Sequence, residues 1–145
     1  MGRLINLSEA ASLAIHCLAL VASSNGSLNA ATMASHLGAS RNHLAKVLQQ
    51  LAKHNYLSST RGPGGGFTMK IAPEEICLYD IYMLMEGKPE VEYCGAHGDE
   101  CPFTECVYGT IREKLTAEFV AYFQQRKISD IMNLGKTNLN RTNHP

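Results

Sequence analysis

Three cysteines, Cys94, Cys101 and Cys106, lie within thirteen residues of this chain. Thiolates are soft ligands that suit zinc or iron–sulfur clusters. An odd number of clustered thiols leaves one over in any disulfide scheme, and the sequence shows no signal-peptide pattern that would favour disulfides. The cluster therefore predicts a metal site that needs a further ligand from elsewhere.

The spacing and surroundings of the cysteines leave the metal and its fourth ligand open. Intervals of six and four residues differ from the closely paired cysteines of common zinc sites. His97, Asp99 and Glu105 are nearby candidates for the fourth ligand, and His97 is the strongest of them by ligand chemistry. The two remaining cysteines, Cys17 and Cys77, fall within helical patterns and are interpreted as packed thiols.

A net charge of zero conceals an uneven distribution along the chain. Residues 1–73 carry six Lys/Arg and one acidic residue, Glu9, whereas residues 74–145 carry seven Lys/Arg and twelve acidic residues. A basic half of this kind is typical of a surface that faces phosphate, although solvated charge gives the same pattern. No apolar run is long enough to span a bilayer, so we expect a cytoplasmic protein without a membrane partner.

The elements that must position these residues follow from hydrophobic periodicity. Helices are predicted over 8–23, 29–37, 41–54, 74–86 and 105–127, and strand-like runs over 56–60 and 67–71. The pattern predicts a mostly α fold, a winged helix-turn-helix with a small β-hairpin wing and a long C-terminal helix. We divide the chain into a DNA-binding domain (1–73), a metal-binding loop with dimerisation helices (74–131) and a disordered tail (132–145).

The third predicted helix has the features of a recognition helix. Its exposed N-terminal face is predicted to carry Ser40, Arg41, Asn42, His43 and Lys46. Arginine can pair with guanine and asparagine with adenine in the major groove, while serine, lysine and the backbone at the helix start suit phosphate. A solvated helix face without any ligand is the alternative.

A glycine-rich turn follows this helix, in the run Arg61-Gly62-Pro63-Gly64-Gly65-Gly66. Three consecutive glycines cost entropy that a simple turn does not require, and they let the backbone approach DNA closely beside Arg61. A nucleotide-binding phosphate loop is excluded, because no Lys-Ser/Thr pair follows and no strand leads into a helix. We predict that Arg61, Gly64, Gly65 and Gly66 contact DNA.

The run SRNHLAKVLQQLAKHNYLSSTRGPGGGF, followed by a helix and a three-cysteine loop, resembles the bacterial winged-helix iron–sulfur transcriptional regulators, the IscR/NsrR-like family. The resemblance spans about residues 3–131. It implies a homodimer that joins through the long C-terminal helix and binds a palindromic double-stranded DNA operator. The apolar stripe on helix 105–127 agrees with it, because such a stripe needs a partner surface, although the chain's own domain can also cover it.

The resemblance assigns Cys94, Cys101 and Cys106 as cluster ligands. IscR-like proteins carry a histidine shortly after the third cysteine, but here Val107 and Tyr108 follow Cys106. Some relatives use an acid near the start of the first helix, which corresponds to Glu9, donated by the same or the partner subunit. The alternative is that Glu9 only stabilises that helix. Three cysteines and one carboxylate favour [4Fe–4S], with [2Fe–2S] as the alternative.

The prediction is therefore a non-enzymatic repressor whose operator affinity responds to NO, redox state or iron–sulfur supply. A winged-helix protein with a purely structural zinc site is the second hypothesis. A thiol enzyme built on Cys101 and Cys106 is disfavoured, since the sequence has no C-x-x-C motif and no evident base beside a nucleophile.

Overall fold

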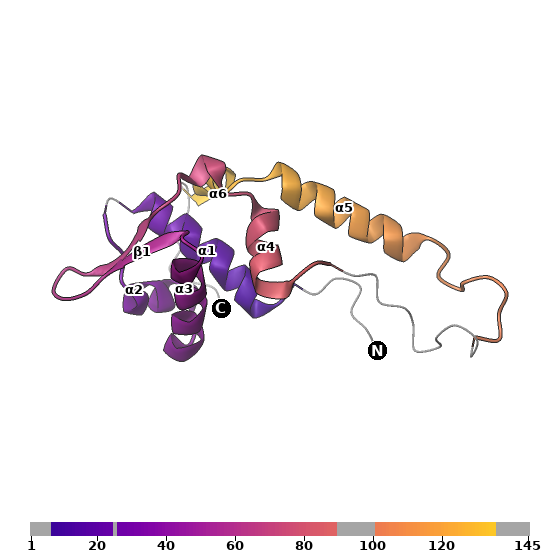
Figure 1. Ribbon diagram of the computed structural model, residues 1–145, viewed down its shortest axis with the longest axis horizontal. Helices are drawn as coiled ribbons and strands as arrows, with labels where there is room; N and C mark the ends of the chain where they lie inside the picture. The colour runs from indigo at the N-terminus through magenta and orange to yellow at the C-terminus, as the bar shows by residue number, and fades with distance from the viewer. Residues whose placement is uncertain (1–6, 25, 90–100, 136–145) are drawn as a thin grey trace.

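The computed structural model describes residues 7–24, 26–89 and 101–135. Its elements are α1 (Glu9–Ser23), α2 (Ala30–Leu37), α3 (Arg41–Lys53), β1 (Leu57–Thr60), β2 (Gly66–Met69), the 3-10 turn η1 (Pro73–Glu75), α4 (Leu78–Glu86), α5 (Ile111–Gln125) and α6 (Ile128–Gly135). Figure 1 shows the β1–β2 hairpin projecting from one end of a helical body, while α5 extends from the other. The predicted winged helix-turn-helix class is confirmed.

Polar side chains fix the starts of the first three helices. Ser8, Asn29 and Ser40 each accept a hydrogen bond from a backbone N–H in the first turn of α1, α2 and α3. Such caps satisfy helix donors that otherwise have no partner. Gly38 ends α2 with a left-handed φ of 61°, which leaves room for the tight turn into α3.

The wing contains a third short segment besides its two strands. β1 and β2 pair antiparallel, with Leu57 opposite Met69 and Thr60 opposite Gly66. Leu28, in the connection between α1 and α2, bonds to Phe67 in both directions, at 3.0 and 2.9 Å. The hairpin is thereby attached through β2 to the segment that leads into α2.

Helix α1 lies at the centre of the core. It packs against α3, α4 and α6, and its Leu18 side chain is completely buried. Leu44, Leu48 and Leu51 bury the inner face of α3. Ile128 of α6 is also completely buried, so the chain returns to this core after α5. The division at residue 73 stays a prediction.

Two predicted helices differ from the observed ones because of backbone pairing and turns that periodicity does not reveal. The 74–86 helix is interrupted at Ile76 and Cys77, where extended backbone pairs with the α5–α6 connection. Ile128 N–H donates to the Ile76 carbonyl at 3.0 Å. The 105–127 helix begins only at Ile111, because Gly109, with a φ of 55°, closes a turn onto the Cys106 carbonyl.

The C-terminal segment also differs from its prediction. Helix α6 continues to Gly135 and therefore occupies the first part of the predicted disordered tail. Ile128 is buried and Ile131 packs against the core, which gives this short helix an apolar face. The remainder of the predicted tail lies outside the described residues.

Candidate nucleic-acid interface and metal-binding cysteines

Helix α3 separates its buried and exposed residues as a recognition helix does. Ser40, Arg41, Asn42 and Lys46 are exposed, while Leu44 and its apolar neighbours face the core. The Ser40 side chain accepts from the His43 N–H at 3.2 Å, which caps the helix. These exposed residues are available for DNA, and their contacts stay a prediction.

His43 lies at the edge of this face and contacts α1 instead. Its Nδ1 is 3.4 Å from Oε2 of Glu9, and the side chains are 34% and 69% exposed, respectively. The pair joins the recognition helix to the first residue of α1. The predicted DNA-contacting role of His43 is untested, and the structure gives this residue a second partner within the protein.

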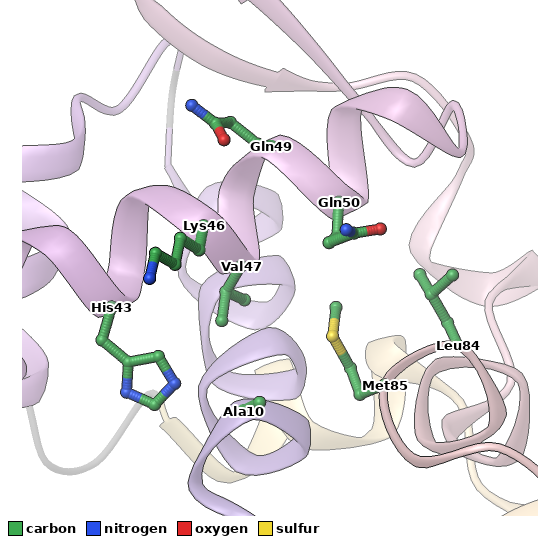
Figure 2. Close-up of a pocket in the computed structure, with 8 residues that line it drawn as sticks. All are labelled: Ala10, His43, Lys46, Val47, Gln49, Gln50, Leu84 and Met85. Atoms are coloured by element: carbon green, nitrogen blue, oxygen red, sulfur yellow. The ribbon is translucent and has the colours of Figure 1, made fainter.

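A groove of about 440 Å³ adjoins this pair on the α4 side of α3. Figure 2 shows His43 and Lys46 at one end of the groove, with Leu84 and Met85 of α4 at the other. Ala10 of α1 also lines it. The groove marks the place where α1, α3 and α4 meet.

The glycines of the wing have different roles. A Cβ on Gly66 would lie 2.7 Å from the Leu28 carbonyl oxygen, and one on Gly65 would collide with the Thr60 carbonyl. These two glycines are therefore required by packing within the wing. A Cβ on Gly64 would meet no atom within 4 Å, although its φ of 73° is left-handed.

The tip of the wing presents Arg61 to solvent. Ser27, from the α1–α2 connection, donates to the Gly64 carbonyl at 2.9 Å and thereby ties the tip to the body. Sequence reasoning missed this contact, since nothing local to Ser27 indicates a partner in the hairpin. A tethered tip loses less conformational freedom when the wing binds a ligand.

Two of the three clustered cysteines lie in the described part of the chain. Cys101 is half-buried, Cys106 is exposed, and both are free thiols. Cys94, His97 and Asp99 lie outside the described residues. No group of three metal-ligating side chains occurs within the described ranges. The three-cysteine ligand set stays a prediction.

The position of Cys106 differs from its prediction. The predicted helix over 105–127 would place Cys106 at its N-terminus, where the helix dipole favours a thiolate. Because α5 begins at Ile111, that argument does not apply. The free, accessible thiols still suit soft metals or an iron–sulfur cluster by donor chemistry.

The other two cysteines are buried, as predicted for packed thiols. Burial raises the pKa of Cys17 from its ordinary value of 9.0 to about 12, which disfavours a thiolate ligand. Cys77 directs its thiol to the carbonyl oxygens of Phe123 and Gln124, at 3.2 and 3.4 Å. Neither residue is placed to bind metal with the clustered cysteines.

Glu9 lies apart from the described cysteines within one chain. It begins α1 beside the end of α4, whereas the segment with Cys101 and Cys106 lies beyond the outer end of α5 in Figure 1. In the described part of this single chain, Glu9 and these two cysteines are not brought into one metal-ligating group. Glu9 as a ligand stays a prediction.

One face of α5 is covered by its own chain and another is not. Phe119 and Phe123 stack on each other and contact Tyr82 of α4, with ring centroids 5.0 and 6.1 Å from that of Tyr82. By contrast, Ile111, Leu115 and Tyr122 are 49%, 41% and 53% exposed. Apolar area of this kind on a projecting helix is a candidate protein interface.

Sequence reasoning also missed the contact between Ser8 and Glu86. Ser8 caps α1, and its hydroxyl also donates to the Glu86 carboxylate, 78 positions along the chain. Only the tertiary packing of α1 against α4 brings the two together.

A helix-turn-helix with an exposed N-terminal face, followed by a tethered wing, defines a winged-helix DNA-binding protein. The chain belongs to the Rrf2 family, described as iron-dependent transcriptional regulators, whose sequence profile matches residues 7–134. It is therefore a DNA-binding transcriptional regulator, and the predicted resemblance is confirmed. The regulators that it matches are not enzymes, in keeping with the predicted lack of catalytic activity.

Individual relatives agree with this family. The chain is 25% identical over 109 residues to the HTH-type transcriptional regulator IscR of Aliivibrio salmonicida, covering 74% of this chain and 64% of that protein. It is 31% identical over 77 residues to NsrR of Geobacillus kaustophilus, covering 52% of each. The chain thus spans only about half to two thirds of these curated relatives.

Solved structures share the fold at lower identity. The global cysteine regulator CymR of B. subtilis superposes with a TM-score of 0.68 at 20% identity, covering 89% of this chain and 97% of that one. IscR of T. potens gives a TM-score of 0.70 at 19% identity, covering 90% and 88%. Among the helices described, none is long and apolar enough to cross a membrane.

Proposed function

We propose that this protein is a homodimeric repressor whose operator affinity is controlled by an iron–sulfur cluster. The ligands would be Cys94, Cys101 and Cys106 of one subunit and Glu9 of the partner subunit. One observation carries the proposal. The segment with the free thiols of Cys101 and Cys106 connects α4, which packs on the DNA-binding body, to α5, whose outer apolar face is uncovered.

DNA reading is assigned to the start of α3 and to the wing. Arg41 is proposed to pair with guanine and Asn42 with adenine in the major groove. Ser40, Lys46 and Arg61 are proposed to bind phosphate oxygens, which fix the register on the duplex. All five side chains are exposed, which supports the assignment.

Dimerisation is assigned to the exposed face of α5. Two copies would bury Ile111, Leu115 and Tyr122 against each other. Such an arrangement also provides a partner for Glu9, since the start of α1 lies apart from Cys101 and Cys106 in one chain. Two winged helices in one dimer match a palindromic operator.

A cluster held by three thiolates and one carboxylate supplies a redox- and NO-reactive group with one weak ligand. The chain's own residues then determine the response. The cysteine-bearing segment is joined to α4 at one end and to α5 at the other. A change in its conformation would therefore act on both the DNA-binding body and the proposed dimer interface. The chain lacks the histidine that IscR-like proteins carry shortly after the third cysteine, and this difference favours NO as the signal.

Anaerobic absorbance spectra test the proposal directly. Wild-type protein should be brown, and Cys101→Ser and Cys106→Ser should be colourless, whereas a structural zinc site gives colourless wild-type protein. Glu9→Ala should alter the spectrum or the rate at which NO bleaches it. An unchanged spectrum in Glu9→Ala removes Glu9 from the ligand set, and a wild-type spectrum insensitive to NO removes NO as the signal.

A further inference from the structure

The first residues of α1 contact two other helices. The Ser8 hydroxyl accepts a hydrogen bond from the Ala11 N–H at 3.2 Å, which caps α1. The same hydroxyl donates to the carboxylate of Glu86, the last residue of α4. The start of α1 is therefore fixed to the end of the helix that precedes the cysteines.

The next residue of α1 contacts the recognition helix. Oε2 of Glu9 lies 3.4 Å from Nδ1 of His43. The backbone N–H of His43 donates to the Ser40 cap, so His43 belongs to the first turn of α3, together with the exposed Arg41 and Asn42. A displacement of Glu9 therefore acts on the turn that carries the proposed base-reading residues.

Two contacts, Glu86 with Ser8 and Glu9 with His43, are thus joined by the peptide bond between Ser8 and Glu9. We name these four residues from three helices the α1 relay. At one end, Gly87 leaves α4 with a φ of 78° and leads toward the cysteines. At the other end lies α3. Because Ser8 and Glu9 are consecutive, a single planar peptide unit separates the contact at Glu86 from the contact at His43.

We propose that the α1 relay transmits the condition of the cysteine-bearing segment to the recognition helix. The inference rests on the proposed function, because it assigns the route by which that segment controls operator binding. Ser8 and Glu86 are then positioning residues for DNA recognition, although neither is assigned a DNA contact. Coupling between distant sites is carried by contacts that have two discrete arrangements, and hydrogen-bond and ion-pair networks are one such kind.

Substitutions at Ser8 and Glu86 distinguish the effect of breaking the relay from the effects of losing the helix cap or a metal ligand. Ser8→Asp keeps an oxygen that accepts from the Ala11 N–H, since aspartate caps helices as well as serine does. Its carboxylate cannot donate to Glu86 and repels it. Glu86→Ala removes the same contact from the other side, and Glu75→Ala, at an exposed acid of η1, is a control with the same change of charge.

The measured quantity is the ratio of operator Kd values with and without a reconstituted cluster. The probe is a duplex that the wild-type protein selects from a random DNA library. In Ser8→Asp and Glu86→Ala, we expect the ratio to move toward one by roughly 2- to 30-fold. Adding His43→Ala to Ser8→Asp should change the ratio little further, because both substitutions interrupt the same series of contacts.

Hydrogen exchange in the cluster-free protein provides a second measurement. Ser8→Asp should speed exchange of amides in the first turns of α3, whereas Glu75→Ala should not. If both relay variants keep the wild-type Kd ratio, the relay is wrong and the proposed function stands. A wild-type ratio of one overturns the proposed function and the relay with it. Should Glu86→Ala fail to fold, the capped variant Ser8→Asp decides alone.

Discussion

The sulfur of Cys77 lies 3.2 Å from the carbonyl oxygen of Phe123, which binds the residue before α4 to the end of α5. Beside it, the Leu78 N–H donates to the Arg126 carbonyl at 3.0 Å. Through these contacts the projecting helix is attached to the DNA-binding body at one end. Together with the packing of Phe119 and Phe123 on Tyr82, these contacts hold α5 against α4.

Removal of the Cys77 thiol should loosen this junction. Cys77→Ala deletes a buried sulfur and its hydrogen bonds, and we expect a loss of about 1–2 kcal/mol in the free energy of unfolding. Urea unfolding followed by circular dichroism measures the change. With cluster-free protein throughout, Cys106→Ala, at an exposed thiol, should leave stability unchanged. Equal stability of the two variants contradicts a structural role for Cys77.

The two ends of α3 should contribute differently to DNA binding. Arg41→Ala is expected to weaken binding to the preferred operator by about 1–3 kcal/mol and to relax base preference at one position. Lys53→Ala, on the last turn of the same helix, removes the same charge and should lower affinity only slightly and equally for all sequences. Binding titrations with single-base operator variants distinguish the outcomes; parallel losses in both variants exclude base reading by Arg41.

The wing glycines can be separated by the same kind of comparison. Gly66→Ala places a methyl group against the Leu28 carbonyl and should cost on the order of 1–3 kcal/mol of stability. Gly64→Ala meets no neighbour but strains a left-handed residue, at about 1–2 kcal/mol. Thermal melts measure stability, and filter binding measures operator affinity. We expect operator affinity per folded molecule to fall further in Gly64→Ala if the wing tip contacts DNA.

The alkaline stability of the protein should depend on Cys17. Because burial raises the pKa of this thiol to about 12, the folded state retains its proton where the unfolded state, with a pKa near 9.0, releases it. The stabilisation is fully present below pH 9 and is lost as pH rises from 9 toward 12. Urea unfolding between pH 8 and about 10.5 should show a steeper decline for wild type than for Cys17→Ala. Equal slopes contradict a buried neutral thiol.

Local chemistry could predict the winged helix but not the contacts that connect it to the rest of the chain. Ser8 and Ser40 are capping residues, a type that marks the starts of α1 and α3 in the sequence. The break at Ile76 depends instead on backbone pairing with Ile128, which lies far along the chain. Periodicity alone continues a helix through such a site, since it does not detect long-range pairing.

The candidate site likewise has residues that the sequence indicates and contacts that only the folded chain shows. Glu9 was conspicuous as the single acid of the basic half, and His43 as part of the recognition helix. Their pairing depends on how α1 crosses α3, which no local pattern specifies. Residue types therefore identified the groups, and tertiary packing determined their partners. The fourth metal ligand belongs to this second kind of question, because the proposed ligand, Glu9, is far from the three cysteines in the sequence.

The oligomeric state should depend on the exposed face of α5. Leu115→Glu places a charge in the proposed interface, where burial without a partner is unfavourable, and we expect a monomer in sedimentation velocity at micromolar concentration. Lys114→Glu, at the adjacent exposed position, changes charge by more but should remain dimeric. A monomer would also lose the partner's Glu9, so Leu115→Glu should resemble Glu9→Ala in its NO response. A dimeric Leu115→Glu protein would place the subunit contact on another surface.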